Sequence, residues 1–328
     1  MNVRKCNICP RKCGIDRTVK DNNQNLGFCG ADNKIKIAWF GKHFGEEPPI
    51  SGPSHPKGGR GKGSGTIFFC QCNLKCVFCQ NWQISWEWRK DNPPSLRRIG
   101  GLRRARKYKT DEVVKLILNL QGQGVENINL ISPTPWAFWL KKVLLEAKKE
   151  GLRIPVIWNS NGYEDVGVLR EIGESRVIDV YLPDYKYSDE KLAVKYSSAP
   201  DYPKIAGEAI MEMYRQVGDL EVDKNGIAKS GLIVRHLILP GQIENTINSL
   251  KFIRSVSANI HLSLMTQYNP LFKAKNFPEI NRTLMKEEYE EVMKTVEDLE
   301  FQNGWIQEFD ESVKCFTPDF KKENPFGK

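Results

Sequence analysis

The sequence contains no apolar run that approaches the roughly 20 residues needed to cross a membrane. The N-terminus, Met1-Asn2-Val3-Arg4-Lys5, also lacks the apolar core of a signal peptide. We therefore expect a cytoplasmic protein with no membrane partner. A nucleotide phosphate loop is missing as well. Lys62 is followed by Gly63, so the glycine-rich stretch 58–65 does not have the required G-x4-G-K-[ST] spacing.

Positive charge is abundant in one segment and close to balanced elsewhere. Of the net charge of +9, the nine Lys or Arg residues between Arg89 and Lys109, less the single acid Asp91, supply +8. A nucleic-acid-binding protein would spread basic residues over a face of its fold, so we expect no nucleic-acid partner. The segment 87–109 is then either a solvated basic loop or a surface for an acidic partner protein or an anionic substrate.

The nine cysteines are unevenly distributed. Four lie within residues 6–29, four lie within residues 70–79, and only Cys315 stands alone. Short spacings in a chain without a signal peptide favour metal binding over disulfides.

The first group consists of Cys6, Cys9, Cys13 and Cys29. Four thiolates in a polar, loop-rich segment are enough for a tetrahedral zinc site or for a second iron-sulfur cluster. The spacing does not choose between these metals, and unliganded thiols are the alternative. Either metal would stabilise a segment that is too short to build its own core.

The second group contains a C-x3-C-x2-C pattern at Cys72, Cys76 and Cys79, directly after the apolar run 65–69. Three thiolates on one short loop can hold three corners of a 4Fe-4S cluster, because soft sulfur ligands suit iron-sulfur centres. The spacing supplies no fourth ligand, so one iron would stay open to a substrate or cofactor. Cys70, two residues upstream, is either a spare thiol or a competing ligand.

From residue 65 onward, short apolar runs alternate with helical patterns. Val113, Leu116, Ile117 and Leu120, for example, form one apolar helix face. The alternation predicts parallel β-α-β units, and six such units make a partial (β/α)6 barrel rather than a closed TIM barrel of eight. The expected strands are 66–69, 128–131, 155–158, 177–182, 232–239 and 260–265. The expected helices are about 110–122, 136–150, 164–173, 188–217, 244–256 and 283–299.

These patterns divide the chain into four parts. The expected parts are a cysteine-rich metal-binding segment (1–40), a Gly/Pro-rich connector without regular structure (41–64), the barrel core (65–310) and a C-terminal tail (311–328).

Polar residues follow the expected strands, where parallel α/β folds place their sites. Asp184 and Lys186 lie two apart, so on an extended segment both point to one face, unless they form a surface ion pair. Arg235 lies inside an apolar run, and such a charge must face a polar cavity or a partner. The other candidates at strand ends are Ser132, Thr134, Asn159, Ser160 and Gln267.

The cysteine pattern, with Asn73-Leu74 inside it and Phe78 before the last cysteine, resembles the signature of radical S-adenosylmethionine (SAM) enzymes. From about Cys6 to Phe326, the chain is similar to the largely uncharacterised branch related to pyruvate formate-lyase activating enzyme. The stretches that carry this resemblance are 65–69, 76–81, 84–85, 181–186, 235–241 and 303–307. Cys70-Gln71 and the basic segment 87–109 depart from the pattern, as does the absence of Gly-Gly-Glu after the second strand.

The resemblance implies a six-unit barrel and a specific chemistry. A 4Fe-4S cluster on Cys72, Cys76 and Cys79 would bind SAM through its open iron and cleave it to a 5′-deoxyadenosyl radical, which abstracts hydrogen from a substrate. Asp184 would bind the ribose of SAM and Lys186 would lie near its carboxylate. The weaker cofactor contacts implied are Ser132, Thr134, Asn159, Ser160, Arg235 and Gln267.

The identity of the substrate stays open between two kinds of oxidoreductase. One is an activase that takes hydrogen from a backbone glycine of a partner glycyl-radical enzyme, with the basic segment as a docking surface. The other modifies a small molecule or a peptide. Both would draw an electron from a reductant such as flavodoxin or ferredoxin. A non-catalytic iron-sulfur electron-transfer protein is a third interpretation.

Overall fold

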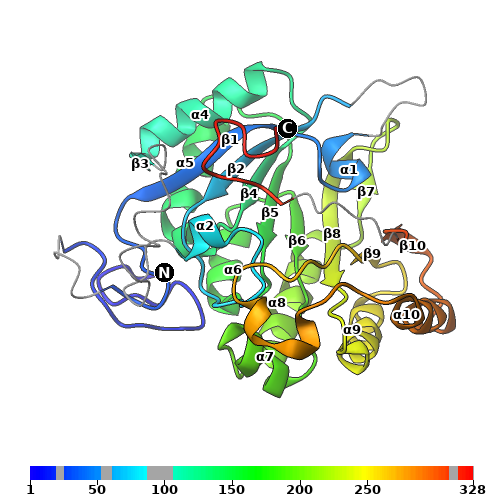
Figure 1. The fold of residues 1–328 in the computed structure, drawn as a ribbon. Coiled ribbons are helices and arrows are strands. Elements are labelled where there is room, and N and C mark those ends of the chain that lie inside the picture. The colour runs from blue at the N-terminus through cyan, green and yellow to red at the C-terminus, as the bar shows by residue number, and fades with distance from the viewer. Residues whose placement is uncertain (20–25, 53–60, 87–105, 310–316, 328) are drawn as a thin grey trace.

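The computed structural model describes residues 1–19, 26–52, 61–86, 106–309 and 317–327. In this part of the chain, one ten-stranded sheet runs in the order β10-β9-β8-β6-β5-β4-β2-β1-β3, with β7 (Glu221–Val222) paired to β8. Helices cover one face of this sheet (Figure 1). No helix among the described residues is long and apolar enough to cross a bilayer.

The middle of the sheet is parallel. Its strands, in spatial order, are β2 (Ser64–Phe69), β4 (Ile128–Ile131), β5 (Val156–Ser160), β6 (Val180–Pro183), β8 (Ala228–Leu237) and β9 (His261–Met265). These six strands confirm the predicted parallel α/β core, and the sheet is not closed into a full barrel.

Three strands that the sequence did not predict extend the sheet at its edges. β10 (Asn303–Ile306) pairs in parallel with β9, whereas β1 (Ile35–His43) is antiparallel to β2 and β3 (Arg106–Tyr108) is antiparallel to β1. The expected boundary at residues 40 and 41 therefore falls inside β1, which belongs to the sheet.

The predicted helices are present, except that one predicted helical region forms two helices. The main helices are α4 (Thr110–Gly122), α5 (Ala137–Lys149), α6 (Val166–Gly173), α7 (Glu190–Ser197), α8 (Tyr202–Val217), α9 (Ile243–Val256) and α10 (Lys286–Asp298). The single region expected at 188–217 is two helices, because Ser198 adopts a left-handed φ of 53° and Pro200 follows it. The short helices are α1 (Pro48–Ser51), α2 (Trp82–Ser85), η1 (Thr134–Trp136), η2 (Ala274–Asn276) and η3 (Pro278–Ile280).

Alternation along the strands gives the sheet two buried faces. Side chains such as Leu130 and Trp158 pack in the large core under the helices. The opposite face, here called the inner face, carries Ile157 and Ile233, which pack against Ile50 of α1 in a separate cluster. The expectation of no regular structure in 41–64 was therefore wrong at α1, because the apolar Ile50 anchors this turn to the inner face.

The C-terminal tail covers the inner face near β2. The ring of Phe320 lies 5.3 Å from that of Phe68 on β2, and Phe326 lies 5.3 Å from Trp39 on β1. In Figure 1 this tail, drawn in red, lies beside β1 and β2. The basic segment 87–109 lies outside the described residues except for its last four positions.

Candidate active site and cysteine loops

The loop that carries Cys72, Cys76 and Cys79, here called the three-cysteine loop (72–79), follows the carboxyl end of β2. Backbone hydrogen bonds attach it to the end of α7. The N–H of Lys75 donates to the carbonyl of Ser197 at 3.1 Å, and that of Val77 donates to the carbonyl of Tyr196 at 2.8 Å. The loop is thus held at the strand edge where parallel α/β proteins place their sites.

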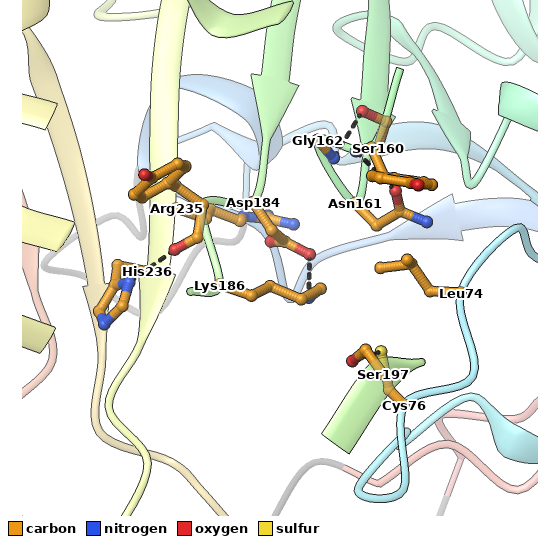
Figure 2. Close-up of polar contacts among 12 residues, drawn as sticks. Leu74, Cys76, Ser160, Asn161, Gly162, Asp184, Lys186, Ser197, Arg235 and His236 are labelled. Carbon is orange, nitrogen blue, oxygen red and sulfur yellow. Dashed lines mark hydrogen bonds and ion pairs between the residues drawn. The ribbon is translucent and has the colours of Figure 1, made fainter. Parts of the chain in front are cut away.

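Hydrogen-bond donors point at the sulfur atoms of this loop. The Ser197 hydroxyl donates to Cys76 Sγ at 3.0 Å (Figure 2). The Asn161 amide donates to Cys72 Sγ at 3.2 Å. The backbone N–H of Leu74 lies 3.4 Å from the same Cys72 sulfur. A thiolate accepts hydrogen bonds better than a thiol, so these donors fit sulfur atoms that are bound to iron.

Burial raises the pKa of the Cys76 thiol. It also raises that of Cys79 to about 12, with Cys76 and Cys72 as further causes. A metal that binds here must therefore displace protons from the thiols. Three soft ligands on one preorganised loop fit an iron-sulfur cluster, and a fourth thiol is not required for it.

Asp184 and Lys186, which follow β6, form an ion pair beside the loop. The Lys186 ammonium donates to the Asp184 carboxylate at 2.6 Å, and both side chains are largely buried (Figure 2). Burial lowers the pKa of Lys186, but the Asp184 carboxylate and the Cys76 sulfur outweigh it and raise the pKa to about 12. Lys186 thus keeps its charge next to the sulfur atoms. The sequence left open that Asp184 and Lys186 form an ion pair on the surface. They do form an ion pair, but it is largely buried.

Arg235 on β8 points to the inner face, but its carboxylate partners come from this chain. Its guanidinium bonds Glu46, and Nε lies 2.6 Å from a Glu47 oxygen that also accepts from Ser263 at 2.8 Å. Nη1 lies 3.4 Å from Asn159 Oδ1. The sequence signal for this partner is the pair of acids, Glu46 and Glu47, directly before Pro48.

Comparisons with known proteins agree with this arrangement. The model of the radical SAM superfamily matches residues 66–253, which is more than half of the chain. The chain belongs to the radical SAM superfamily. It is also 31% identical over 300 residues to an uncharacterized protein of Methanocaldococcus jannaschii, covering 90% of this chain and 75% of that protein.

The chain is also similar, at low identity, to parts of two solved structures. SuiB of Streptococcus suis bound to its precursor peptide SuiA has a TM-score of 0.46 and 15% identity, over 73% of this chain and 47% of SuiB. The methyltransferase TsrM of Kitasatospora setae, with cobalamin and a 4Fe-4S cluster bound, has a TM-score of 0.41 and 10% identity, over 59% of this chain and 32% of TsrM. The chain thus spans about half of SuiB and a third of TsrM.

Cys70 of this radical SAM protein is packed away from the three-cysteine loop. Its side chain is fully buried in a small apolar cluster with Phe68 and Ile84, whereas the three loop cysteines contact the main core. Gln71, at a left-handed φ of 74°, forms the turn that separates Cys70 from Cys72. This packing favours the assignment of the cluster to Cys72, Cys76 and Cys79.

Thr134 and Ser160 both donate hydrogen bonds to the carboxyl group of Glu164, a residue that the sequence did not single out. Glu164, fully buried between β5 and α6, accepts from the Thr134 hydroxyl at 2.7 Å and from the Trp158 indole at 3.1 Å. Burial raises the pKa of Glu164 to about 7, although Thr134, Trp158 and Ser160 donate to it. Ser132 is half-buried after β4, and Gln267 is half-buried two residues after β9.

We expect Glu164→Gln to remove a pH dependence of stability. A folded pKa of about 7, above the usual 4.5, means that Glu164 favours folding at low pH and that this contribution is lost as pH rises from 4.5 to about 7. The variant should lie within about 1 kcal/mol of the wild type at pH 5 and exceed it by up to about 3 kcal/mol at pH 8. Urea unfolding at both pH values measures this, with exposed Glu174→Gln as the matched control. Equal pH profiles for wild type and Glu164→Gln would contradict it.

The inner face also carries two amide side chains with unmet hydrogen-bonding capacity. Asn129 on β4 is fully buried, and neither its oxygen nor its nitrogen finds a partner among the described residues. In the same part of the chain, the amide nitrogen of Asn159 on the adjacent β5 is also unpartnered. Buried polar atoms without partners are costly, so these positions are suited to a ligand or to water.

The N-terminal cysteines gather in one place. Burial raises the pKa of Cys9 well above its usual value, and Cys29, Cys13 and Cys6 raise it further. Backbone N–H groups lie 3.3 Å from Cys13 Sγ and 3.5 Å from Cys29 Sγ. In the described ranges, no three Cys, His, Asp or Glu side chains are close enough together to hold a single metal ion.

Proposed function

We propose that this radical SAM protein holds a 4Fe-4S cluster on Cys72, Cys76 and Cys79 and abstracts a hydrogen atom from its substrate, as an oxidoreductase. Cys72, Cys76 and Cys79 would hold the cluster, which when bound would supply the electron for cleavage of SAM to the 5′-deoxyadenosyl radical and a position at which SAM binds. The proposal rests mainly on the three-cysteine loop, which lies at the carboxyl end of β2 with hydrogen-bond donors aimed at its sulfur atoms.

The protein's own residues would bind and orient SAM. The charged ammonium of Lys186 suits the carboxylate of SAM, and the Asp184 carboxylate holds that ammonium in place while presenting an oxygen to ribose. Asn159 and Arg235 would complete the polar surface on the inner face. Thr134 and Ser160 would act indirectly, since both bond Glu164, while Ser132 and Gln267 stay proposed contacts.

The decisive experiment is anaerobic reconstitution with iron, sulfide, dithionite and SAM, followed by chromatography for 5′-deoxyadenosine. We expect its formation above the protein-free background. A fully loaded cluster that never cleaves SAM would contradict the proposal and favour an iron-sulfur electron-transfer protein. In the cell, a donor such as flavodoxin or ferredoxin would replace dithionite, which accords with the proposed cytoplasmic location.

For the substrate we propose a peptide segment, with a backbone glycine of a glycyl-radical enzyme as the specific activase case. The supporting observation is the pair of unmet amide groups of Asn129 and Asn159, which match the N–H and C=O of a main chain. Candidate partners would be incubated with the reduced protein and SAM and examined for a glycyl-radical EPR signal. If a small molecule but no peptide or partner stimulated SAM cleavage, the alternative of small-molecule modification would hold.

We also propose that Cys6, Cys9, Cys13 and Cys29 bind a second metal centre, zinc or iron-sulfur. The supporting observation is that these thiols lie near one another and are largely buried, and metal binding would offset the cost of burying them.

We propose the division of the chain into 1–40, 41–64, 65–310 and 311–328, with β1 assigned to the core because it pairs with β2.

A further inference from the structure

Arg11, which lies between Cys9 and Cys13 in the sequence, reaches out of the N-terminal segment to the three-cysteine loop. Its Nε donates to the carbonyl of Asn73 at 3.0 Å, and its Nη1 donates to the carbonyl of Ser198 at 2.7 Å. One guanidinium thus joins two main-chain positions that are distant in sequence. A planar fork can make both bonds at once, which a single ammonium does less well.

Both carbonyls are adjacent to residues that shape the loop. Asn73 follows Cys72 directly, and Ser198 follows Ser197, whose hydroxyl donates to the Cys76 sulfur. Arg11 therefore connects the two sides between which the three-cysteine loop is held. A displacement of Arg11 would therefore move Asn73, the neighbour of Cys72, and Ser198, the neighbour of the residue that donates to Cys76 Sγ.

Two more contacts join the same surfaces. The side-chain nitrogen of Gln71 donates to the carbonyl of Gly30, which follows Cys29, at 2.5 Å. The Arg11 guanidinium lies 3.8 Å from the ring centre of Phe28, which precedes Cys29, and 5.0 Å from that of Tyr163. Arg11 thus packs on Phe28, the neighbour of Cys29, while Gln71, the residue directly before the three-cysteine loop, bonds the turn after Cys29.

The two cysteine groups share a local backbone arrangement. Cys9 accepts a hydrogen bond from the N–H of Arg11, and Cys29 accepts one from Ala31, in each case two residues later. In the three-cysteine loop, Cys72 accepts from Leu74 and Cys79 accepts from Asn81 at the same separation. Hydrogen bonds from backbone N–H groups stabilise a thiolate more than a thiol. The same arrangement therefore suits cysteines that bind a metal.

We propose that the N-terminal cysteines bind a thiophilic metal centre whose task is to position the three-cysteine loop, with Arg11 as the positioning residue. The inference rests on two parts of the proposed function, the second metal centre and the three-cysteine loop as the catalytic cluster site. Metal binding would fix the turn after Cys9, and with it the guanidinium that holds Asn73 and Ser198. Four thiolates are a ligand set of both zinc and iron-sulfur centres. No three metal-ligating side chains of the described residues are close enough for a single ion, which favours an iron-sulfur cluster over zinc, and metal analysis distinguishes them.

The test compares Cys9→Ser combined with Cys29→Ser, Arg11→Ala, Arg11→Lys and the exposed control Lys5→Ala, each in the full chain after anaerobic reconstitution. Zinc, iron and sulfide per chain report the metal content. Hydrogen exchange at the amides of Lys75 and Val77 reports the loop, because these amides donate to the end of α7. The EPR spectrum of the reduced cluster, with and without SAM, reports the cluster environment, and exchange in α9 reports global stability.

We expect the cysteine double variant to lose one metal centre and to exchange the Lys75 and Val77 amides at least about tenfold faster, with α9 unchanged. Arg11→Ala should keep that centre yet show the same acceleration and an altered EPR response to SAM. Arg11→Lys should recover part of the protection, and Lys5→Ala should match the wild type. The fold-change corresponds to the loss of charge-assisted hydrogen bonds to the two carbonyls.

The proposal is overturned if the wild type holds no metal beyond the loop cluster, or if losing the N-terminal centre leaves loop exchange unchanged. Either result can occur in a protein that still forms 5′-deoxyadenosine, so the proposed radical SAM activity would survive it. Conversely, a coupled second centre in a protein that never cleaves SAM would overturn the proposed function and leave this inference standing.

Discussion

Replacing Cys76 with alanine should abolish cluster loading on the three-cysteine loop and reduce 5′-deoxyadenosine formation to the protein-free background. Two thiols cannot hold three corners of the cluster, and the buried position of Cys76 leaves no room for an outside ligand to replace the sulfur. The hydroxyl of Ser197, which donates to this sulfur, would lose its acceptor as well. Iron, sulfide and product analysis after identical reconstitution measures the effect.

Two cysteine controls make this result specific. Cys70→Ala removes a thiol that lies two residues from the loop but packs in a separate apolar cluster, so we expect full iron loading and ordinary SAM cleavage. Cys315→Ala, at a position outside the described residues, should also load fully. Equal iron loss in Cys76→Ala and Cys70→Ala would refute the ligand assignment.

The parallel core was predictable because its strands and helices alternate with clear periodicity. The helix 110–122, for instance, was predicted at the bounds of α4. The edge strands were not predictable on this basis. β10 is only four residues long and half exposed, and β1 continues past its buried start Ile35–Ala38, which includes Lys36, into residues that alternate in exposure. Their pairing depends on the neighbouring strand rather than on their own pattern.

In the candidate site, the residues that are close in sequence could be predicted from their spacing. The partners that come together only in the folded protein could not. The three cysteines lie within eight residues, so their shared loop could be predicted. Glu164 carries no such signal, because it is buried against the hydroxyl of Thr134, 30 residues earlier, as well as against the indole of Trp158. Arg235 was expected to face a polar cavity or a charged partner, but a sequence separation of 188 residues concealed that this partner is Glu47.

We expect Arg235→Met to destabilise the protein by about 3–5 kcal/mol, because it leaves buried carboxylates without their cation. Arg235 holds both Glu46 and Glu47, and all three side chains are largely buried between α1, β8 and β9. Methionine fills much of the same volume, so the loss reports charge rather than a cavity. Urea unfolding at pH 7 measures it, and a loss below about 1 kcal/mol would contradict the assigned pairing.

The pH dependence of the same variant should change sign. In the wild type, burial raises the pKa of Glu47, but Arg235 outweighs it and holds the pKa below its usual value. Wild-type stability from this group is thus present above the unfolded pKa and is lost as pH falls through the lower folded value. Without Arg235 burial dominates, so Arg235→Met should gain stability from pH 7 to pH 5. Adding Glu46→Gln and Glu47→Gln should abolish this gain and recover much of the loss, because neutral amides need no buried cation. If the triple variant kept the pH response of Arg235→Met, another group would have to carry it.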